Sequence, residues 1–246
     1  MNELNGKRAL VTGGSRGIGA AIAIALAEKG ADVAITYERS GDRAAAVVRS
    51  IEEKGRKALA IQADSADPDA IKRSVEEALG ALGGLDILVN NAAIGRGGTV
   101  ADISLEDIQA LLDVNVRAPL LFAKAVIPHL KEGGRIISIG SSLAERVPFP
   151  GVTAYAMTKS ALLAFTRGLS RELGPRNITA NIILPGAVDT EMNPANSPIA
   201  DVTRSMLALG RYGEPEEIAA AVAFLASPAA GLITGAVIAV DAGANA

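Results

Sequence analysis

The fold of this chain is decided by one stretch, Arg8-Ala9-Leu10-Val11-Thr12-Gly13-Gly14-Ser15-Arg16-Gly17-Ile18-Gly19. Four residues with strand character run into a glycine-rich turn, and the apolar segment that follows is typical of a helix. Glycine in such a turn accepts a positive φ and lets the backbone approach a pyrophosphate at the helix N-terminus. The spacing Gly13-x-x-x-Gly17-x-Gly19 lacks the Lys-Ser/Thr of a Walker loop. The stretch predicts a dinucleotide-binding strand–turn–helix unit, although a tight turn alone would also favour glycine here.

Outward from this unit, short β-rich runs alternate with longer helical patterns. Most runs are continuous and apolar, as in strands that a parallel sheet buries on both faces. The expected strands are 8–11, 32–37, 58–62, 87–90, 135–139, 179–184 and 236–240. The expected helices are 17–29, 41–55, 68–81, 104–131, 155–173 and 214–226. This alternation predicts an α/β protein with one doubly wound, Rossmann-type domain, a seven-stranded parallel sheet and helices on both faces. Because no linker divides residues 1–246, we expect a single domain.

Residues 190–212 interrupt the alternation. The segment 193–198 is polar and contains two prolines, and a short helical pattern follows it up to Leu209. Doubly wound proteins bind ligands beyond the carboxyl ends of their strands, and long loops there often act as lids. We therefore interpret residues 190–212 as a substrate loop, with a solvated connector as the alternative.

The composition narrows the class of protein. Nearly half of the residues are apolar, which is enough for a substantial core and unlike a disordered chain. The formal net charge of −3 gives no support for nucleic-acid binding. Since the chain has no cysteine, disulfides, thiol nucleophiles and zinc–thiolate sites are excluded, and with a single histidine no metal site is expected.

The expected location follows from segments that are missing. Residues 1–7 lack the basic and apolar regions of a signal peptide. The longest apolar runs, 20–27 and 218–226, are shorter than the roughly 20 residues that span a bilayer. We therefore expect a cytoplasmic protein that does not bind membranes.

A second signature lies far from the glycine turn, in Tyr155-Ala156-Met157-Thr158-Lys159. On a helix, residues four apart lie on one face, so the Lys159 ammonium is expected beside the Tyr155 phenol. A neighbouring cation favours the deprotonated phenol and lowers its pKa from the usual value of about 10. Such a tyrosine can act as a general acid or base. Behind a dinucleotide-binding turn, this pair indicates an oxidoreductase.

Together these segments resemble the short-chain dehydrogenase/reductase family, and the resemblance extends over essentially the whole chain. The family's TGxxxGIG, NNAG, YxxxK, PGxxxT and DGG motifs correspond in order to residues 12–19, 90–93, 155–159, 185–190 and 241–243. Two departures are present, because Ala93 and Ala242 stand where the family has glycine. The layout is similar to that of the family's 3-oxoacyl-carrier-protein reductases.

The resemblance implies a role for each of four catalytic residues. Tyr155 would exchange a proton with the substrate oxygen, and Lys159 would lower its pKa and hold the nicotinamide ribose. Ser141 would polarise the substrate oxygen, and Ser142 is the alternative, because the family's spacing to the tyrosine varies by one residue. Only one of the two can reach this oxygen, since neighbouring side chains of an extended segment point in opposite directions. Asn115 would hold a water in the proton relay. A side-chain amide that satisfies backbone groups at a helix irregularity is the structural alternative for Asn115.

The same resemblance favours NADP(H) over NAD(H) as the cofactor. Family members that bind NAD carry a carboxylate at the end of the second strand, where this chain has Tyr37. Arg16, Arg39 and Ser40 would donate to a 2′-phosphate, whereas Glu38 argues for NAD. Asp64 resembles the family's adenine-contacting aspartate, with helix capping as its alternative. The other residues that the resemblance places at the cofactor are Gly13, Ser15, Gly17, Ile18, Gly19, Ser65, Asn91, Ala92, Ala93, Pro185, Gly186, Val188 and Thr190, in addition to Tyr155 and Lys159.

The function implied is an NADP(H)-dependent oxidoreductase that interconverts a carbonyl and a secondary alcohol of a small molecule. One alternative is a 3-oxoacyl-carrier-protein reductase, whose acyl carrier protein would dock on basic residues such as Lys131, Arg171 and Arg176. A remote alternative is a non-catalytic dinucleotide-binding protein. Apolar residues of segments 104–131 and 155–173 predict a homotetramer, with a dimer as the alternative. The substrate and the direction of the reaction stay open.

Overall fold

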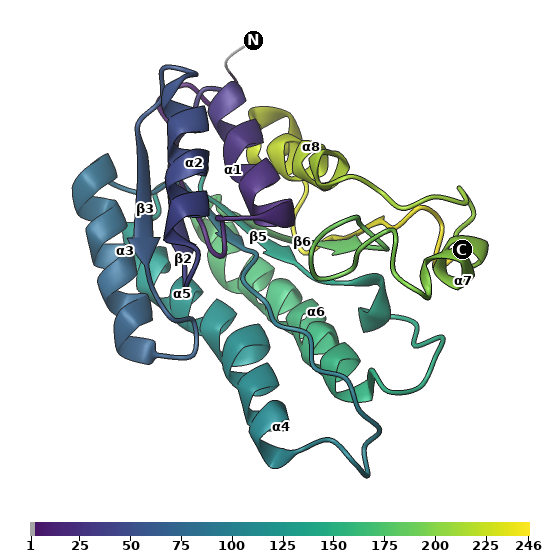
Figure 1. The fold of residues 1–246 in the computed structure, drawn as a ribbon. Coiled ribbons are helices and arrows are strands. Elements are labelled where there is room, and N and C mark those ends of the chain that lie inside the picture. Colours follow the sequence, from purple (N-terminus) through teal and green to yellow (C-terminus); the bar gives the residue numbers. More distant parts are fainter. Residues whose placement is uncertain (1–2) are drawn as a thin grey trace.

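The computed structural model describes residues 3–246, which form a seven-stranded parallel sheet of order β3-β2-β1-β4-β5-β6-β7 (Figure 1). The strands are β1 (Arg8–Val11), β2 (Asp32–Tyr37), β3 (Ala58–Gln62), β4 (Ile87–Asn90), β5 (Arg135–Ile139), β6 (Thr179–Pro185) and β7 (Val237–Val240). The predicted fold class is confirmed. Only the end of β6 and the start of β7 differ from the predicted strands, each by one residue. The strand order reverses between β1 and β4, which is the point where such sheets bind ligands.

Eight α-helices connect the strands. They are α1 (Gly17–Glu28), α2 (Gly41–Glu52), α3 (Pro68–Leu82), α4 (Leu105–Leu112), α5 (Ala118–Val126), α6 (Thr153–Leu173), α7 (Ala200–Ser205) and α8 (Pro215–Ala226). Short turns of 3₁₀-helix are η2 (Ile127–His129), η3 (Ser142–Ala144), η4 (Gly174–Arg176) and η5 (Pro228–Ala230), and η1 (Asp113–Arg117) is a π-helix. Side-chain caps fix two of the helix starts: Asp67 accepts from the Asp69 N–H, and Ser104 from the Asp107 N–H.

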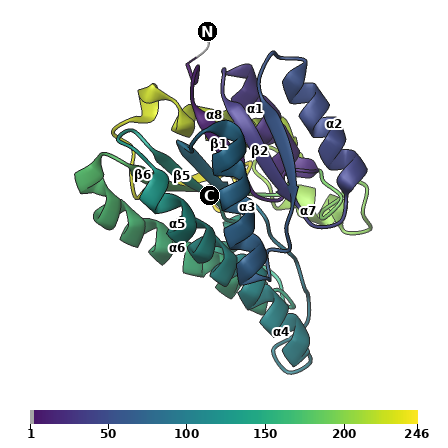
Figure 2. The same ribbon diagram turned by 90° about the vertical axis from the view of Figure 1, so that its left-hand side faces the viewer.

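The helices cover both faces of the sheet (Figures 1 and 2). On one face, α1, α2 and α8 pack on the sheet around Ile22, Leu26 and Val222. On the other face, α3, α5 and α6 pack around Ile71 and Phe122. Because every central strand lies between two apolar layers, its residues are apolar on both sides, which explains the continuous runs in the sequence.

The predicted helix 104–131 is helical from Leu105 to His129, but it is not α-helical throughout, because the π-helix η1 lies between α4 and α5. In an α-helix the carbonyl of Asn115 would accept a hydrogen bond from the N–H of residue 119, but residue 119 is proline and has none. The chain instead widens by one residue here, and the Ala118 N–H donates to the carbonyl of Asp113, five residues back. Such π-turns occur often at functional sites.

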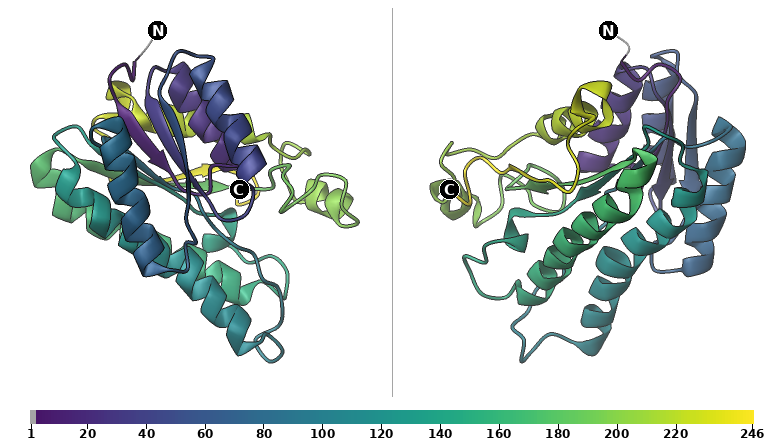
Figure 3. Two further views of the ribbon diagram at one scale, coloured as in Figure 1. Left: turned by 60° about the vertical axis from the view of Figure 1, so that its left-hand side comes forward. Right: turned by 180° about the vertical axis from the view of Figure 1, so that it is seen from behind.

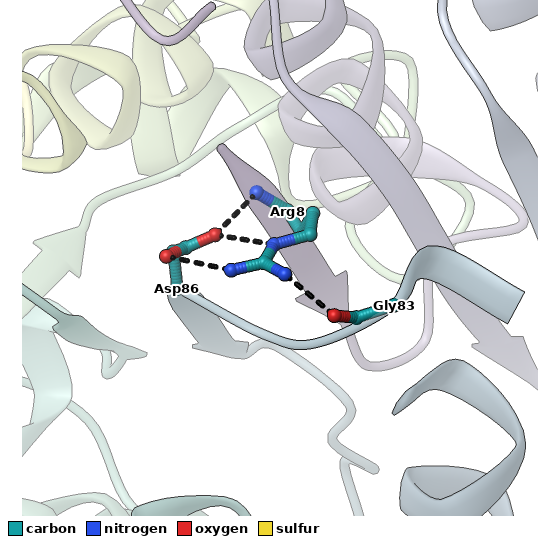
Figure 4. A network of polar contacts seen from close by, with 3 residues as sticks. All are labelled: Arg8, Gly83 and Asp86. Carbon is teal, nitrogen blue, oxygen red and sulfur yellow. Dashed lines mark hydrogen bonds and ion pairs between the residues drawn. The ribbon is translucent and has the colours of Figure 1, made fainter. Parts of the chain in front are cut away.

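An ion pair lies at the amino ends of the strands, and a long loop lies at their carboxyl ends. At the amino ends of the strands, Arg8 forms a two-pronged ion pair with Asp86, and its Nη1 donates to the Gly83 carbonyl at 2.7 Å (Figure 4). At the carboxyl ends, residues 190–212, which include α7, extend outward beyond the sheet (Figure 3). No helix among residues 3–246 has the combination of length and apolar composition that crossing a bilayer requires.

Candidate active site

The glycine turn after β1 is shaped by contacts that leave no room for side chains. Gly13 has φ +64° and Gly17 has φ +52°. A Cβ added to Gly13 would lie 2.9 Å from the Cα of Ala92, and one added to Gly19 would lie 2.3 Å from the Gly13 carbonyl oxygen. The glycines are therefore required by the path of the backbone, in addition to any ligand.

The segment after β4 holds this turn in place. Thr12 Oγ1 accepts from the N–H groups of Asn91 (3.0 Å) and Ala92 (2.9 Å). In return, Asn91 Nδ2 donates to the carbonyls of Thr12 (2.9 Å) and Gly13 (3.1 Å). The Asn91 side chain is thus committed to positioning the turn. Ala92 and Ala93 continue along the same edge of the sheet.

The first turn of α1 suits an anion. Arg16 occupies the N-cap position without a capping hydrogen bond from its side chain, and the first turn contains no acidic residue. The N–H groups and the positive end of the helix dipole therefore have no side-chain anion of the helix itself opposite them. Ser15 precedes this turn, and Ile18 lies within it. A Cβ on Gly17 would lie 3.3 Å from Thr190 Cγ2, so the segment after β6 forms the opposite wall.

That opposite wall is packed tightly as well. Pro185 ends β6, and a Cβ on Gly186 would lie 2.6 Å from the carbonyl oxygen of Asp241. Val188 is buried, and its backbone pairs with Gly213 in an isolated parallel bridge. The glycine turn and the segment after β6 therefore meet at the carboxyl ends of the strands, which is where doubly wound proteins bind dinucleotides.

The residues after β2 and β3 are those expected to contact the adenosine part of the cofactor. Arg39 is paired with Glu38 at 2.8 Å and is 87% exposed. Ser40 occupies the N-cap position of α2 without a capping hydrogen bond. Asp64 Oδ1 accepts from the Ala66 N–H at 2.8 Å, so it closes a local turn next to Ser65, while Asp67 caps α3. The helix-capping alternative for Asp64 was therefore wrong.

One basic residue of this region was not predicted from the sequence to lie at the site. Arg43, in the first turn of α2, forms an ion pair with Glu191, which also binds Arg16 at 2.8 Å. These three residues lie 27 and 148 positions apart along the chain, so no local pattern could have linked them. The only signal was a cation in the first turn of a helix, where the dipole disfavours positive charge.

Tyr155 and Lys159 lie on α6, as the spacing predicts. Lys159 Nζ is 5.8 Å from the centre of the Tyr155 ring. Lys159 is only 3% exposed, and its Nζ donates to the Ile139 carbonyl at 3.0 Å. The pair therefore lies against the end of β5.

Burial has the largest effect on the pKa of both groups. It raises the pKa of Tyr155 to about 12, while a hydrogen bond with Ser141 acts in the lowering direction. Burial also lowers the pKa of Lys159 to about 8, because the charged ammonium loses its hydration. The expected lowering of the Tyr155 pKa is therefore not present in this structure, and the phenol is protonated at neutral pH.

The two candidate serines occupy different environments. Ser141 has an extended backbone just after β5; its Oγ accepts from the Leu143 N–H at 3.2 Å, and its side chain is hydrogen-bonded to Tyr155. Ser142 begins η3, and its carbonyl accepts from Asn245 Nδ2 at 2.9 Å. The structure thus brings Ser141 to Tyr155, and it brings the C-terminal segment to Ser142. Asn245 belongs to no sequence motif, so its contact with Ser142 could not be predicted from the sequence.

Asn115 is buried, and its amide is fully engaged. Its Oδ1 accepts from the Ile94 N–H at 2.9 Å, and its Nδ2 donates to the Ile94 carbonyl (2.9 Å) and to Thr158 Oγ1 (3.2 Å). The side chain satisfies backbone groups beside the π-helix, which is the structural alternative stated above. It thereby joins the segment after β4 to α6, close to the Tyr155–Lys159 pair.

Comparison with known proteins gives matches over nearly the full length. Residues 13–245 match a family model described as enoyl-(acyl carrier protein) reductase. The crystal structure of a short chain dehydrogenase from Burkholderia cenocepacia J2315 in complex with NADP is 57% identical, with a TM-score of 0.98 over 99% of this chain and 100% of that chain. The cyclic-di-GMP-binding biofilm dispersal mediator protein of Escherichia coli K12 is 44% identical over 241 residues, 98% of each chain. The 3-oxoacyl-[acyl-carrier-protein] reductase of Synechocystis is 39% identical over 246 residues, 99% of this chain and 98% of that protein.

These similarities agree with the residues and with the geometry. The glycine turn, the Asn91 segment, Ser141 and the Tyr155–Lys159 pair all lie at the carboxyl edge of one parallel sheet. The chain belongs to the short-chain dehydrogenase/reductase family.

Proposed function

We propose that this protein is an NADP(H)-dependent oxidoreductase that interconverts a carbonyl and a secondary alcohol. The observation that carries the proposal is the convergence of Ser141, Tyr155 and Lys159 at the carboxyl end of β5, in the same sheet whose β1 leads into the glycine turn. A phenol and a hydroxyl are thus available to one substrate oxygen, at the same end of the sheet as the glycine turn. The NADP-bound relative from Burkholderia supports the choice of cofactor.

The chain's own residues would prepare and protonate the substrate. When bound, the nicotinamide cofactor supplies or accepts the hydride. Ser141 donates a hydrogen bond to the carbonyl oxygen and stabilises its growing negative charge. Tyr155 gives this oxygen its proton, and charged Lys159 stabilises the phenolate that remains. In the reverse direction the phenolate takes the proton of the alcohol.

The resemblance implied that Asn115 holds a water of the proton relay, and we propose that only its main chain does so. Since its amide is bound to Ile94 and Thr158, the side chain has no remaining donor for a water. The main-chain carbonyl of Asn115, which cannot accept the ordinary bond from Pro119, is the group that we propose for this water. The amide itself would act as a positioning group for the Ile94 segment.

The substrate is proposed as a class. A small ketone is the first candidate, and a 3-oxoacyl thioester on acyl carrier protein is the second, supported by the similarity to the Synechocystis reductase. Of the three basic residues considered for docking that carrier, Arg176 already donates to the carbonyls of Ile127 and Leu130. Arg171 and Lys131 are exposed and remain candidates.

A spectrophotometric assay tests the reaction and the substrate class together. NADPH absorbance is followed with acetoacetyl thioesters and with a panel of ketones and diketones, and NADH is run in parallel. We expect NADPH-dependent reduction of at least one substrate and its loss in Tyr155→Phe. Equal residual rates in wild type and Tyr155→Phe with every substrate would contradict the proposed chemistry.

The non-catalytic alternative is favoured by one observation, the similarity to an E. coli protein that is named for binding cyclic di-GMP. A binding protein has no need of Ser141, Tyr155 and Lys159 in one cluster, so we rank it second. Calorimetric titration with cyclic di-GMP tests it. Tight binding of this ligand, together with no turnover of any ketone or thioester, would make the alternative the better description.

We also propose the homotetramer that the sequence suggested, with a different set of exposed apolar residues at its interfaces. Leu111, Phe122 and Leu162 are buried within the protomer, so they cannot contribute to an interface. Leu120 and Met157 are each 54% exposed on α5 and α6, and Phe224 on α8 is 49% exposed. Light scattering tests the proposal, with a monomer at micromolar concentration as the contrary result.

A further inference from the structure

Residues 241–245, which follow β7, lie against residues 141–146, which we call the serine turn. Asp241 shapes the segment after β7. It is only 9% exposed, and its Oδ1 accepts from the Gly243 N–H at 3.0 Å while its Oδ2 accepts from the Asn245 N–H at 3.1 Å. Because both carboxylate oxygens bind the backbone of the segment, the Asn245 side chain starts from a fixed position.

Two hydrogen bonds join this segment to the serine turn. Asn245 Nδ2 donates to the carbonyl of Ser142 at 2.9 Å. In the opposite direction, Arg146 Nη1 donates to the carbonyl of Ala244 at 2.9 Å. Asn245 is partly buried, whereas Arg146 is exposed. Since water competes less for a partly buried hydrogen bond, we expect the bond of Asn245 to contribute more to the position of the turn.

Inside the serine turn, the backbone sets the direction of the Ser141 hydroxyl. The Leu143 N–H donates to Ser141 Oγ at 3.2 Å, which occupies one acceptor position of this oxygen and leaves its hydrogen to donate elsewhere. The Ser142 carbonyl, which Asn245 binds, also accepts at 3.2 Å from each of the two N–H groups that close the turn. A donor fixed at this carbonyl therefore holds the conformation in which the Ser141 hydroxyl is oriented.

The segment after β7 also contacts the substrate loop. The Leu209 N–H donates to the carbonyl of Ala242 at 3.1 Å. A Cβ added to Gly243 would lie 2.5 Å from the Cβ of Ala208, so the two segments are in close contact there. The segment is thus held by the loop on one side, and from this position it reaches the serine turn on the other.

The serine turn needs such support because it is short. Its η3 helix has 3₁₀ hydrogen bonds, whose geometry is poorer than that of an α-helix. On the side of α6, Ser160 Oγ donates to the carbonyl of Ala144 at 2.6 Å. Asn245 binds the turn two residues earlier, at Ser142, which directly follows Ser141. Of these two side-chain donors, Asn245 is therefore the one that acts next to the proposed catalytic hydroxyl.

We infer that Asn245 is a positioning residue for Ser141. Through the Ser142 carbonyl, it holds the serine turn in the form that directs the Ser141 hydroxyl to the substrate oxygen. The inference rests on the proposed carbonyl–alcohol function, and it adds to that site a residue that none of the sequence motifs contains.

Steady-state kinetics test the inference with a ketone or thioester that the wild type reduces. Asn245→Leu keeps a branched side chain of similar size but removes the donor. We expect kcat/KM to fall at least tenfold, chiefly through kcat, while NADPH affinity measured by fluorescence stays unchanged. Asn5→Leu, at an exposed asparagine before β1, is the matched control and should change neither quantity.

The Ser141→Ala background separates positioning from a general structural role. Without the hydroxyl there is nothing left to position, so adding Asn245→Leu to Ser141→Ala should change kcat/KM by less than about twofold. If Asn245→Leu lowers kcat/KM by the same factor in both backgrounds, it acts independently of Ser141 and the inference is overturned. An unchanged kcat/KM in the Asn245→Leu single variant would overturn it as well.

Hydrogen exchange tests the positioning without turnover. In Asn245→Leu, the N–H groups of residues 143–146 should exchange several-fold faster by NMR, while those of β5 keep their rates. Unchanged rates in the turn, or an equal acceleration in β5, would overturn the inference. Because this measurement needs no substrate, a failure of the proposed reaction and a failure of the positioning role give different outcomes.

Discussion

Lys159 Nζ donates a hydrogen bond of 3.0 Å to the main-chain carbonyl of Ile139, two residues before Ser141. Through this bond, α6 is fastened to the carboxyl end of β5. The Tyr155 and Ser141 side chains therefore lie close together, although Tyr155 belongs to α6 and Ser141 follows β5. A charge that is 3% exposed depends on such contacts, because it has lost nearly all of its hydration.

The buried ammonium should make stability depend on pH. Its pKa is lowered from 10.5 to about 8 by burial. Between these values the unfolded chain holds a proton that the folded chain does not, so the free energy of unfolding rises with pH, by up to about 1.4 kcal/mol per unit. Below pH 8 both states are charged, and the full cost of burial is present. Lys159→Met removes this titration.

Urea unfolding of wild type and Lys159→Met at pH 7, 8, 9 and 10 checks the sign. We expect the variant to be the more stable protein at pH 7 and its advantage to shrink as the pH rises. Other titrating groups are common to both proteins and cancel in the difference. A difference that is constant with pH would show that the folded pKa of Lys159 is not lowered.

Tyr155→Phe removes the proposed proton donor and leaves the ring in place. The turnover number should fall at least ~10²-fold, which is the usual contribution of a general acid. Since the substitution keeps the aromatic ring and leaves Lys159 in place, NADPH affinity should stay within about twofold. Steady-state kinetics and a fluorescence titration separate the two effects. Near-wild-type turnover in Tyr155→Phe would mean that another group delivers the proton.

The strands could be predicted closely because their signal is local. Each central strand is an apolar run that the sheet buries on both faces, so its length can be counted directly in the sequence. The π turn within helix 104–131 could not be seen from apolar periodicity, because α4 and α5 keep an apolar face on either side of it. Pro119, which cannot donate to the Asn115 carbonyl, was the available signal.

The site could be predicted wherever a motif is contiguous. The glycine turn and the Tyr155–Lys159 pair each lie within one element, so their spacing determines their geometry. Arg43 and Glu191 meet only because α2 and the segment after β6 converge at the carboxyl edge of the sheet. Burial, which sets the direction of the Tyr155 pKa, is likewise a property of the packed structure.

The ion pair between Arg8 and Asp86, at the amino ends of β1 and β4, should contribute to the free energy of unfolding. Arg8 Nε binds Asp86 Oδ2 at 2.7 Å, and the two side chains are 22% and 12% exposed. Arg8→Ala leaves the Asp86 carboxylate without its main partner, so we expect a loss of roughly 1.5–3 kcal/mol, the scale of hydrogen bonds to charged groups. Lys72→Ala, which breaks the exposed pair with Glu76, should cost at most about 0.5 kcal/mol. Equal urea midpoints for the two variants would contradict this prediction.

Ala242 is strained where the family's motif has glycine. Its φ is +56°, a left-handed conformation that costs a residue with a Cβ about 1 kcal/mol or more. Ala242→Gly should therefore stabilise the protein, by less than about 1 kcal/mol because glycine also gains freedom in the unfolded chain. Ala220→Gly, on the exposed side of α8, should destabilise it by about 1 kcal/mol. Thermal unfolding distinguishes the two, and a destabilised Ala242→Gly would show that the strain is absent.

The neighbouring serines give the sharpest test of the proposed mechanism. The Ser141 side chain is hydrogen-bonded to Tyr155 and acts to lower its pKa, whereas the carbonyl of Ser142 accepts a hydrogen bond from Asn245. Ser141→Ala should therefore cost about 2–4 kcal/mol of transition-state stabilisation, the scale of an oxyanion donor. Ser142→Ala keeps that carbonyl and should cost much less. The ratio of kcat/KM values for the two variants measures the difference. If Ser142→Ala is the slower enzyme, the hydroxyl that polarises the substrate oxygen comes from Ser142, and the path of the chain after β5 in the working enzyme differs from the one described above.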